Sequence, residues 1–195
     1  MNIYEQIKNY TPFNEQEEKD QQILLDCLKK YDNIFLRDNK TAHFTASAWI
    51  VNKERTKVIM AYHNIYNSWS WLGGHADGET DLLKVAVKEA AEESGAENIK
   101  VVSGDIFSLE VLTVDGHIKK GEYVSSHLHL NVTYLLEADE TEKLKKREGE
   151  NSAVSWFELD EAIEMSNETW FKENIYNKLN EKVRQLEGGE MRSEE

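Results

Sequence analysis

Cysteine and long apolar runs are scarce in this chain of 195 residues. The single cysteine, Cys27, rules out an internal disulfide bond and favours a reducing compartment. No apolar run approaches the roughly 18 residues that a membrane span requires, and the opening "MNIYEQIKNY" lacks an apolar signal segment. We therefore expect a cytoplasmic protein with no membrane partner. Because no Pro-rich or Ser-rich linker interrupts the chain, we expect one main domain.

Basic residues are also few relative to acidic ones. The chain has 37 acidic and 23 basic side chains, which gives a formal net charge of -14. Such a surface repels a nucleic-acid backbone, so we expect no nucleic acid duplex as a partner. A site that handles phosphate groups on this chain needs metal ions to offset the repulsion.

Residues 1–40 are expected to form a helical extension. Asn14 and Glu17 have the spacing of a capping box, and Leu24 and Leu28 recur at helical spacing with Cys27 alongside as a core residue. The natural interpretation is a helix packed on the main domain. A helix that binds a partner protein is the alternative.

Residues 41–165 read as the main domain, with mixed strands and helices. "HFTASAWIV" and "KVIMAY", joined by "NKERT", predict a β-hairpin, and further strands are expected at "IKVVSG", "IFSLEVLTV" and "SAVSWFEL". A short helix should start at Asp160. A C-terminal helix over 166–187 is expected to pack on this domain, and 188–195 is expected to form a flexible tail.

The strand "VSSHLHLNVTYLL" has one apolar and one polar face. The polar face carries His127, His129, Asn131 and Thr133. Two histidines at this spacing can line a pocket or bind Zn²⁺, but exposure to solvent is the favoured interpretation. A substrate cleft on this face is the alternative.

The stretch "GGHADGETDLLKVAVKEAAEESG" places a glycine-rich loop before a helix with clustered glutamates. At about 100° per residue, one helical stripe is expected to face the core, formed by Leu83, Val87, Ala90, Ala91 and Ser94. Glu89, Glu92 and Glu93 then share a separate arc. Like charges so close repel by a few tenths of a kcal/mol per pair. A bound Mg²⁺ or Mn²⁺ ion makes the same cluster of carboxylates favourable. A solvated acidic face is the alternative from the glutamates alone.

This stretch resembles the signature of the Nudix hydrolase family. That signature is Gly, five residues, Glu, seven residues, then Arg-Glu-apolar-x-Glu-Glu-x-Gly-apolar, and the chain from Lys88 to Ala96 reads "KEAAEESGA". Lys88 stands where the family has arginine, and Thr80 where it has the first glutamate, with Glu79 one position early. The resemblance implies an α+β fold, a Nudix-like α/β/α sandwich with a mixed β-sheet.

The resemblance also implies a chemistry. Nudix enzymes cleave a diphosphate bond in a nucleoside diphosphate linked to another moiety, so Glu89, Glu92 and Glu93 are expected to bind Mg²⁺ or Mn²⁺, with the backbone carbonyl of Gly74 as a further ligand. Catalysis is expected from Glu92, Glu93 and one further carboxylate. The loop "KKREGENSAVSW" offers Glu148 and Glu150. Glu150 is favoured because it lies nearer the strand, and a solvated loop is the alternative.

Substrate-binding residues are expected around the loop and the polar strand: His75, Lys88, Trp71, His127 and His129. His75 is as well explained as a turn residue, and Trp71, like Trp69, is more often packed or anchoring a loop than stacked on a base.

Three classes of protein remain in view. The leading hypothesis is the metal-dependent hydrolase. A non-catalytic Nudix-like binding or regulatory module is the alternative, and it has no need of a repulsive glutamate triad. An isopentenyl-diphosphate isomerase-like enzyme would need a cysteine in the sheet region, where this chain has none. A homodimer is compatible with the sequence, which does not identify the substrate.

Overall fold

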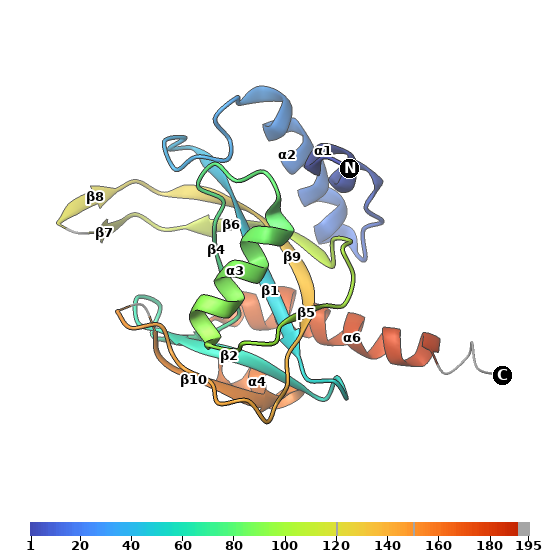
Figure 1. Cartoon of the computed structure of the whole chain (residues 1–195). Helices are drawn as coiled ribbons and strands as arrows, with labels where there is room; N and C mark the ends of the chain where they lie inside the picture. The colour runs from blue at the N-terminus through green and yellow to red at the C-terminus, as the bar shows by residue number, and fades with distance from the viewer. Residues whose placement is uncertain (120, 150, 191–195) are drawn as a thin grey trace. The chain divides into compact units, whose positions relative to one another are not determined.

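The computed structural model describes residues 1–119, 121–149 and 151–190, and Figure 1 labels its elements. The chain divides into two compact units. Unit 1 consists of Met1–Ala48, Gly73–Glu89 and Ser103–Leu135, and unit 2 of Trp49–Leu72, Ala90–Val102 and Leu136–Glu195. Four elements contain residues of both: β1 (Ala42–Val51), β4 (Leu72–His75), α3 (Leu82–Ser94) and β9 (His127–Glu137).

Unit 1 begins with two helices, α1 (Ile3–Asn9) and α2 (Glu15–Lys30). The side chain of Asn14 accepts a hydrogen bond from the backbone N–H of Glu17 at 3.0 Å, which confirms the predicted helix start. The Glu17 carboxylate bonds the N–H of Phe13, one residue before the capping residue, so the capping box is displaced by one position. Cys27 is only partly buried, whereas Leu24 is fully buried.

Helix α2 packs against β6 (Ser108–Val114) within unit 1. The backbone N–H of Val111 donates to the Asp20 carboxylate at 2.9 Å, and the Gln16 side chain donates to the carbonyl of Leu109 at 3.2 Å. Two backbone groups of β6 thus find side-chain partners on the helix.

The strands of unit 1 centre on β9. Strand β6 runs antiparallel to β9, from the pair Ser108–Thr133 to the pair Val114–His127, and β4 (Leu72–His75) pairs with β1. The predicted strand over 124–136 breaks at Ser125 and Ser126. Its first residue belongs to β8 (Glu122–Val124), which forms a hairpin with β7 (His117–Lys119).

The polar face of β9 is buried at Asn131 and Thr133, whereas His127 and His129, for which exposure was favoured, are partly buried. Asn131 and Thr133 are 1% and 0% exposed. Asn131 accepts hydrogen bonds from the hydroxyls of Thr45 and Ser47 at 2.9 Å each and donates to Glu110 at 2.9 Å. The face is buried because neighbouring strands supply a polar partner for each polar group, which removes the penalty of unpaired burial.

Unit 2 contains the predicted hairpin. Strand β2 (Lys57–His63) pairs antiparallel with the end of β1 through Val51 and Val58, which confirms the hairpin. Its other neighbours are β3 (Ser68–Ser70) and β10 (Asn151–Glu158). The short β5 (Lys100–Val101) pairs with the last residues of β9.

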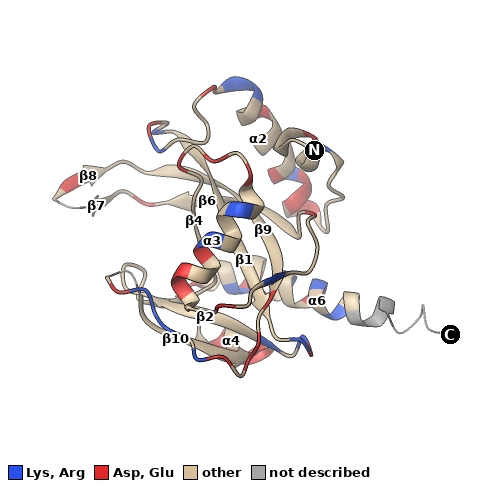
Figure 2. Ribbon diagram, in the orientation of Figure 1, with Lys and Arg blue, Asp and Glu red and all other residues tan. Residues whose placement is uncertain are grey.

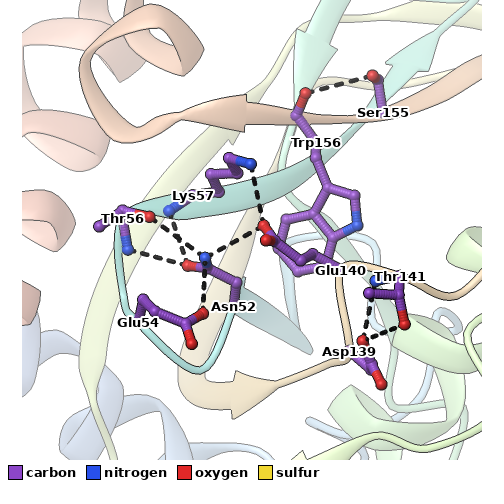
Figure 3. A network of polar contacts seen from close by, with 9 residues as sticks. All are labelled: Asn52, Glu54, Thr56, Lys57, Asp139, Glu140, Thr141, Ser155 and Trp156. Carbon is purple, nitrogen blue, oxygen red and sulfur yellow. Dashed lines mark hydrogen bonds and ion pairs between the residues drawn. The ribbon is translucent and has the colours of Figure 1, made fainter.

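The turn between β1 and β2 is organised by Asn52, which is 2% exposed (Figure 3). The side-chain oxygen Oδ1 of Asn52 accepts hydrogen bonds from the backbone N–H groups of Thr56 and Lys57 at 2.9 Å each. Its amide lies 3.3 Å from Glu140, whose carboxylate also pairs with the Lys57 ammonium at 3.0 Å. Asn52 therefore fixes the hairpin turn by satisfying its backbone donors.

The C-terminal half of unit 2 is helical. Helix α4 (Leu159–Met165) follows β10, close to the predicted start at Asp160. The predicted C-terminal helix is divided into α5 (Thr169–Phe171), a π-helical turn η1 (Lys172–Tyr176) and α6 (Asn177–Glu190). Residues 188–190 of the expected tail thus belong to α6, and 191–195 lie outside the described residues. Within the described chain, no helix is long and apolar enough to cross a bilayer.

Candidate metal centre and surrounding site

The start of α3 is held by Glu79 and Asp81. The Glu79 carboxylate accepts from the N–H groups of Thr80 and Asp81 at 2.9 and 3.1 Å and pairs with the Lys84 ammonium at 2.7 Å. Asp81 accepts from the N–H of Lys84 at 3.1 Å, as a capping residue does. The Lys84 hydrogen bond holds the pKa of Glu79 below its ordinary value, assisted by the N–H of Asp81. Glu79 thus has a local capping role at the helix start.

Helix α3 ends at the predicted glycine. Gly95 has a φ of 68°, and its N–H donates to the carbonyl of Ala91 at 2.9 Å. A Cβ at this position would meet the Cβ of Lys145 at 2.7 Å. Glycine is required here both for the backbone conformation and for the close approach of the 145 segment.

The buried arc of α3 differs from the predicted stripe. Leu83, Val87 and Ala91 are only partly buried. The buried residues share a spacing of three or four and are Leu82, Val85, Ala86, Glu89, Ala90, Glu93 and Ser94. Glu89 and Glu93 therefore lie within the buried arc, and only Glu92 lies toward solvent. The prediction of separate stripes is wrong because the helix is rotated by roughly one residue, about 100°.

Glu89 contacts the glycine loop in unit 1. A Cβ at Gly74 would lie 2.6 Å from Cδ of Glu89, so the backbone there approaches the carboxylate as only glycine allows. The Lys88 ammonium lies 3.2 Å from Glu89 Oε1, while the Lys88 side chain is 62% exposed. Gly74, Lys88 and Glu89, all predicted site residues, are thus brought together.

Glu92 contacts the segment before β10, and Glu93 contacts the first residue of β10, both in unit 2. The Arg147 guanidinium lies 3.2 Å from Glu92, and the Asn151 amide donates to Glu93 at 3.3 Å. The other amide atom of Asn151, its Oδ1, is buried and has no hydrogen-bond partner among the described residues. Sequence reasoning missed both residues, because it searched the loop "KKREGENSAVSW" for acids and not for a cation or an amide.

The two predicted extra carboxylates are placed differently. Glu148 is strongly exposed and lies 3.9 Å from the Lys146 ammonium. Glu150, the favoured residue, lies outside the described residues.

The donor set of α3 fits a hard divalent cation. Its carboxylates are oxygen ligands at i, i+3 and i+4 on one helix, and Figure 2 shows the acidic segments gathered toward the C-terminal end of α3. Two of the three are 9% and 5% exposed, where a carboxylate is stable only with cations or hydrogen-bond donors around it. The residues present therefore fit Mg²⁺ or Mn²⁺ in ligand chemistry.

A second group of possible ligands consists of histidines in unit 1. His43, His75 and His129 come from β1, β4 and β9, and their ligand nitrogens lie within 4.8 Å of one another. The His127 ring stacks on that of His43 at 4.9 Å. Burial, together with the neighbouring His75 and His43, lowers the pKa of His129 to about 2. Burial also lowers the pKa of His43, so both imidazoles are neutral near pH 7.

The two tryptophans near the glycine loop are packed in unit 2. Trp71 makes edge-to-face contacts with Phe171 and Tyr176, at 6.0 and 5.8 Å between ring centroids. Trp69 makes such contacts with Tyr62 and Phe157. Both rings therefore anchor surrounding segments, the alternative to base stacking given from the sequence.

Comparison with known proteins extends these observations. The family model of the NUDIX domain matches residues 41–179. Solved structures also resemble the chain. One is an Ap4A hydrolase from C. elegans in a binary complex, which is 17% identical in sequence. The match covers 75% of this chain and 98% of the hydrolase chain, with a TM-score of 0.54. A NUDIX family hydrolase from Clostridium perfringens is 22% identical, with coverages of 74% and 97% and a TM-score of 0.51.

A third structure, the E. coli dihydroneopterin triphosphate pyrophosphohydrolase, is 12% identical with coverages of 73% and 92% and a TM-score of 0.50. At these identities the likeness concerns the fold, and it confirms the predicted α+β class with a mixed sheet and helices. A search of curated proteins found no match.

Proposed function

The chain belongs to the NUDIX domain family, and from this premise we propose that it hydrolyses a diphosphate bond in a nucleoside diphosphate linked to another moiety, with Mg²⁺ or Mn²⁺ held by Glu89, Glu92 and Glu93. The enzyme class, a Nudix-type pyrophosphohydrolase, follows from the family. The ligands, the metal and the substrate are the proposal.

The observation that carries the proposal is the burial of Glu89 and Glu93 on α3. An acidic run on a solvated face has exposed side chains, whereas these residues are 9% and 5% exposed. Burying two carboxylates one helical turn apart costs free energy unless cations and donors compensate. A bound divalent cation would stabilise these buried carboxylates. Their burial also disfavours the interpretation of a solvated acidic face.

Several groups of the chain support the chemistry. A bound Mg²⁺ or Mn²⁺ ion neutralises the diphosphate and acidifies the attacking water. Glu89, Glu92 and Glu93 hold the ion from a rigid helix, with the carbonyl of Gly74 as a further ligand. Lys88 and Arg147 place positive charge beside the carboxylates, where substrate phosphates require it.

The proton of the attacking water needs an acceptor. We assign it to the segment before β10, with Glu150 favoured over the exposed Glu148. Among the substrate-binding residues expected from the sequence, Lys88 has a largely exposed ammonium group beside Glu89. It is therefore the favoured contact for a substrate phosphate.

The experiment is a substrate panel with a matched set of variants. Nucleotide sugars, dinucleoside polyphosphates and nucleoside triphosphates are incubated with and without Mg²⁺ or Mn²⁺. A dinucleoside tetraphosphate is included because one structural relative is an Ap4A hydrolase. Turnover should require the metal ion, and Glu92→Gln and Glu93→Gln should each lower it by about 100-fold or more, since even supporting residues of metal sites contribute 10- to 100-fold.

The control is Glu97→Gln, an exposed acid just beyond α3. It should retain full turnover and separate loss of a ligand from loss of one negative charge. Full activity in both Glu92→Gln and Glu93→Gln would refute the metal assignment. Tight nucleotide binding without turnover across the panel would instead support a non-catalytic binding module.

A further inference from the structure

Four of the six histidines of the chain form one cluster in unit 1, which the glutamate site does not use. His43, His75 and His129 bring their ligand nitrogens within 4.8 Å of one another, from three different strands. His127 Nε2 lies 3.3 Å from His129 Nε2. Histidines gathered for packing alone have no need to converge through their nitrogens.

Two rings of this cluster have nitrogens with fixed roles. His43 Nδ1 lies 3.1 Å from the carbonyl oxygen of Asn39, and His127 Nδ1 lies 2.8 Å from that of Ser125. A carbonyl oxygen only accepts, so each Nδ1 carries the proton and each Nε2 of a neutral ring presents a lone pair. Metal-binding histidines are held by this same arrangement, in which the second nitrogen donates to a carbonyl.

The lone pair of His43 is the least satisfied part of the cluster. His43 is 4% exposed. Its Nε2 is buried and finds no hydrogen-bond partner in the described part of the chain. An orphaned buried acceptor of this kind destabilises the folded chain, and a cation at this position would satisfy it.

The spacing between His127 and His129 is also that of metal ligands. Two nitrogens that each lie 2.0–2.1 Å from a tetrahedral zinc ion are about 3.3–3.4 Å apart. The observed separation of the two Nε2 atoms is 3.3 Å. Without an ion, a contact between these two Nε2 atoms requires one ring to carry a proton on Nε2 and donate it to the other ring.

We propose that His43, His75 and His129, with His127 as the fourth ligand, form a binding site for one transition-metal ion of the Zn²⁺ type. Neutral imidazole nitrogens suit Zn²⁺, Ni²⁺ or Cu²⁺, whereas Mg²⁺ prefers the carboxylate oxygens of α3. The ion ties β4 to β1 and β9, directly after the glycines Gly73 and Gly74. The site therefore stabilises the glycine loop and does not depend on the proposed hydrolysis.

The test is titration of the intact chain with Zn²⁺ in the presence of excess Mg²⁺, which occupies oxygen sites. Calorimetry should show one Zn²⁺ ion bound per chain, and Zn²⁺ should raise the melting temperature. Two-dimensional NMR of the imidazole nitrogens should show the Nε2 signals of His43 and His127 shifting together. No saturable binding by the wild-type chain would overturn the proposal.

The variants use partly exposed histidines, so that folding is retained. His75→Asn and His127→Gln should each weaken Zn²⁺ binding by about tenfold or more, because each removes one ligand. His63→Asn, the control in unit 2, should leave the affinity unchanged. Equal binding by the wild type and both variants would overturn the proposal, as would loss of Zn²⁺ binding on Glu93→Gln alone, since that result places the ion at the carboxylates.

Discussion

The backbone of Gly74 lies directly against the carboxylate of Glu89. A Cβ at position 74 would be 2.6 Å from Cδ, 2.8 Å from Cγ and 2.9 Å from Oε2 of Glu89. All three atoms belong to the end of one side chain, so a methyl group there displaces the carboxylate more readily than the backbone. The position of the proposed ligand Glu89 therefore depends on the absence of a side chain at Gly74.

Gly74→Ala should therefore impair metal binding more than folding. We expect Mn²⁺ affinity to fall by about tenfold or more, because ligand positioning commonly contributes 10- to 100-fold, while the melting temperature changes little. The matched control is Gly104→Ala, since a Cβ at Gly104 meets no atom within 4 Å. Calorimetric titration with Mn²⁺ measures the affinity, and equal binding by the two variants would contradict the assignment of Glu89 as a ligand.

Arg147→Gln should tighten the binding of Mn²⁺ in the absence of nucleotide. The guanidinium lies 3.2 Å from Glu92 and competes with a cation for that carboxylate. A half-exposed ion pair of this kind contributes about 0.2–1 kcal/mol, so the dissociation constant should fall by roughly 1.5- to 5-fold. Lys146→Gln, which changes the neighbouring charge, is the control. Weaker Mn²⁺ binding in Arg147→Gln would show that Arg147 supports the site instead.

Glu168 predicts a pH dependence of stability in unit 2. Burial raises the pKa of its carboxyl, partly opposed by hydrogen bonds from Ser70 and Ser68. A raised carboxyl pKa means that the folded state holds its proton more strongly than the unfolded state. The resulting stability is fully present below the ordinary pKa of about 4.3 and is lost as pH rises through the raised value.

Glu168→Gln should consequently be more stable than the wild type at neutral pH, and it should lack this part of the pH dependence. The free energy of unfolding in urea, measured from about pH 4 to pH 8, tests the expectation. Glu173→Gln, an exposed acid in η1, is the control. Parallel stability curves for the wild type and Glu168→Gln would contradict the raised pKa.

Asn131→Leu should strongly destabilise unit 1. The substitution removes one hydrogen bond each from the hydroxyls of Thr45 and Ser47 and from the carboxylate of Glu110 in a buried layer. Glu110 keeps its hydrogen bonds from Ser108 and Thr133. Each of the two buried hydroxyls that loses Asn131 costs about 1–3 kcal/mol, so a loss of roughly 2 kcal/mol or more is expected. Thr113→Val, at an exposed position of β6, should change stability by less than about 0.5 kcal/mol. Urea denaturation compares the two, and similar losses would contradict a structural role for the layer.

The sequence by itself determined where the glutamate cluster lies and where several elements begin or end. Asn14 predicted the start of α2, and Gly95 predicted the end of α3, because capping and left-handed backbone conformations are local properties. The hairpin of β1 and β2 was also readable, since segments rich in β-branched and aromatic residues flank a polar turn. The spacing of Glu89, Glu92 and Glu93 follows from helical geometry alone.

Tertiary structure decided which groups surround these residues. The rotation of α3 placed Glu89 and Glu93 in the buried arc, and periodicity did not reveal this, because apolar residues lie on both the predicted and the observed arcs. Arg147 and Asn151 reach Glu92 and Glu93 from more than fifty positions away. His43 and His75 join His129 only because β1, β4 and β9 are neighbours. Sequence fixes local backbone preferences, whereas a site assembled from distant strands depends on packing between them.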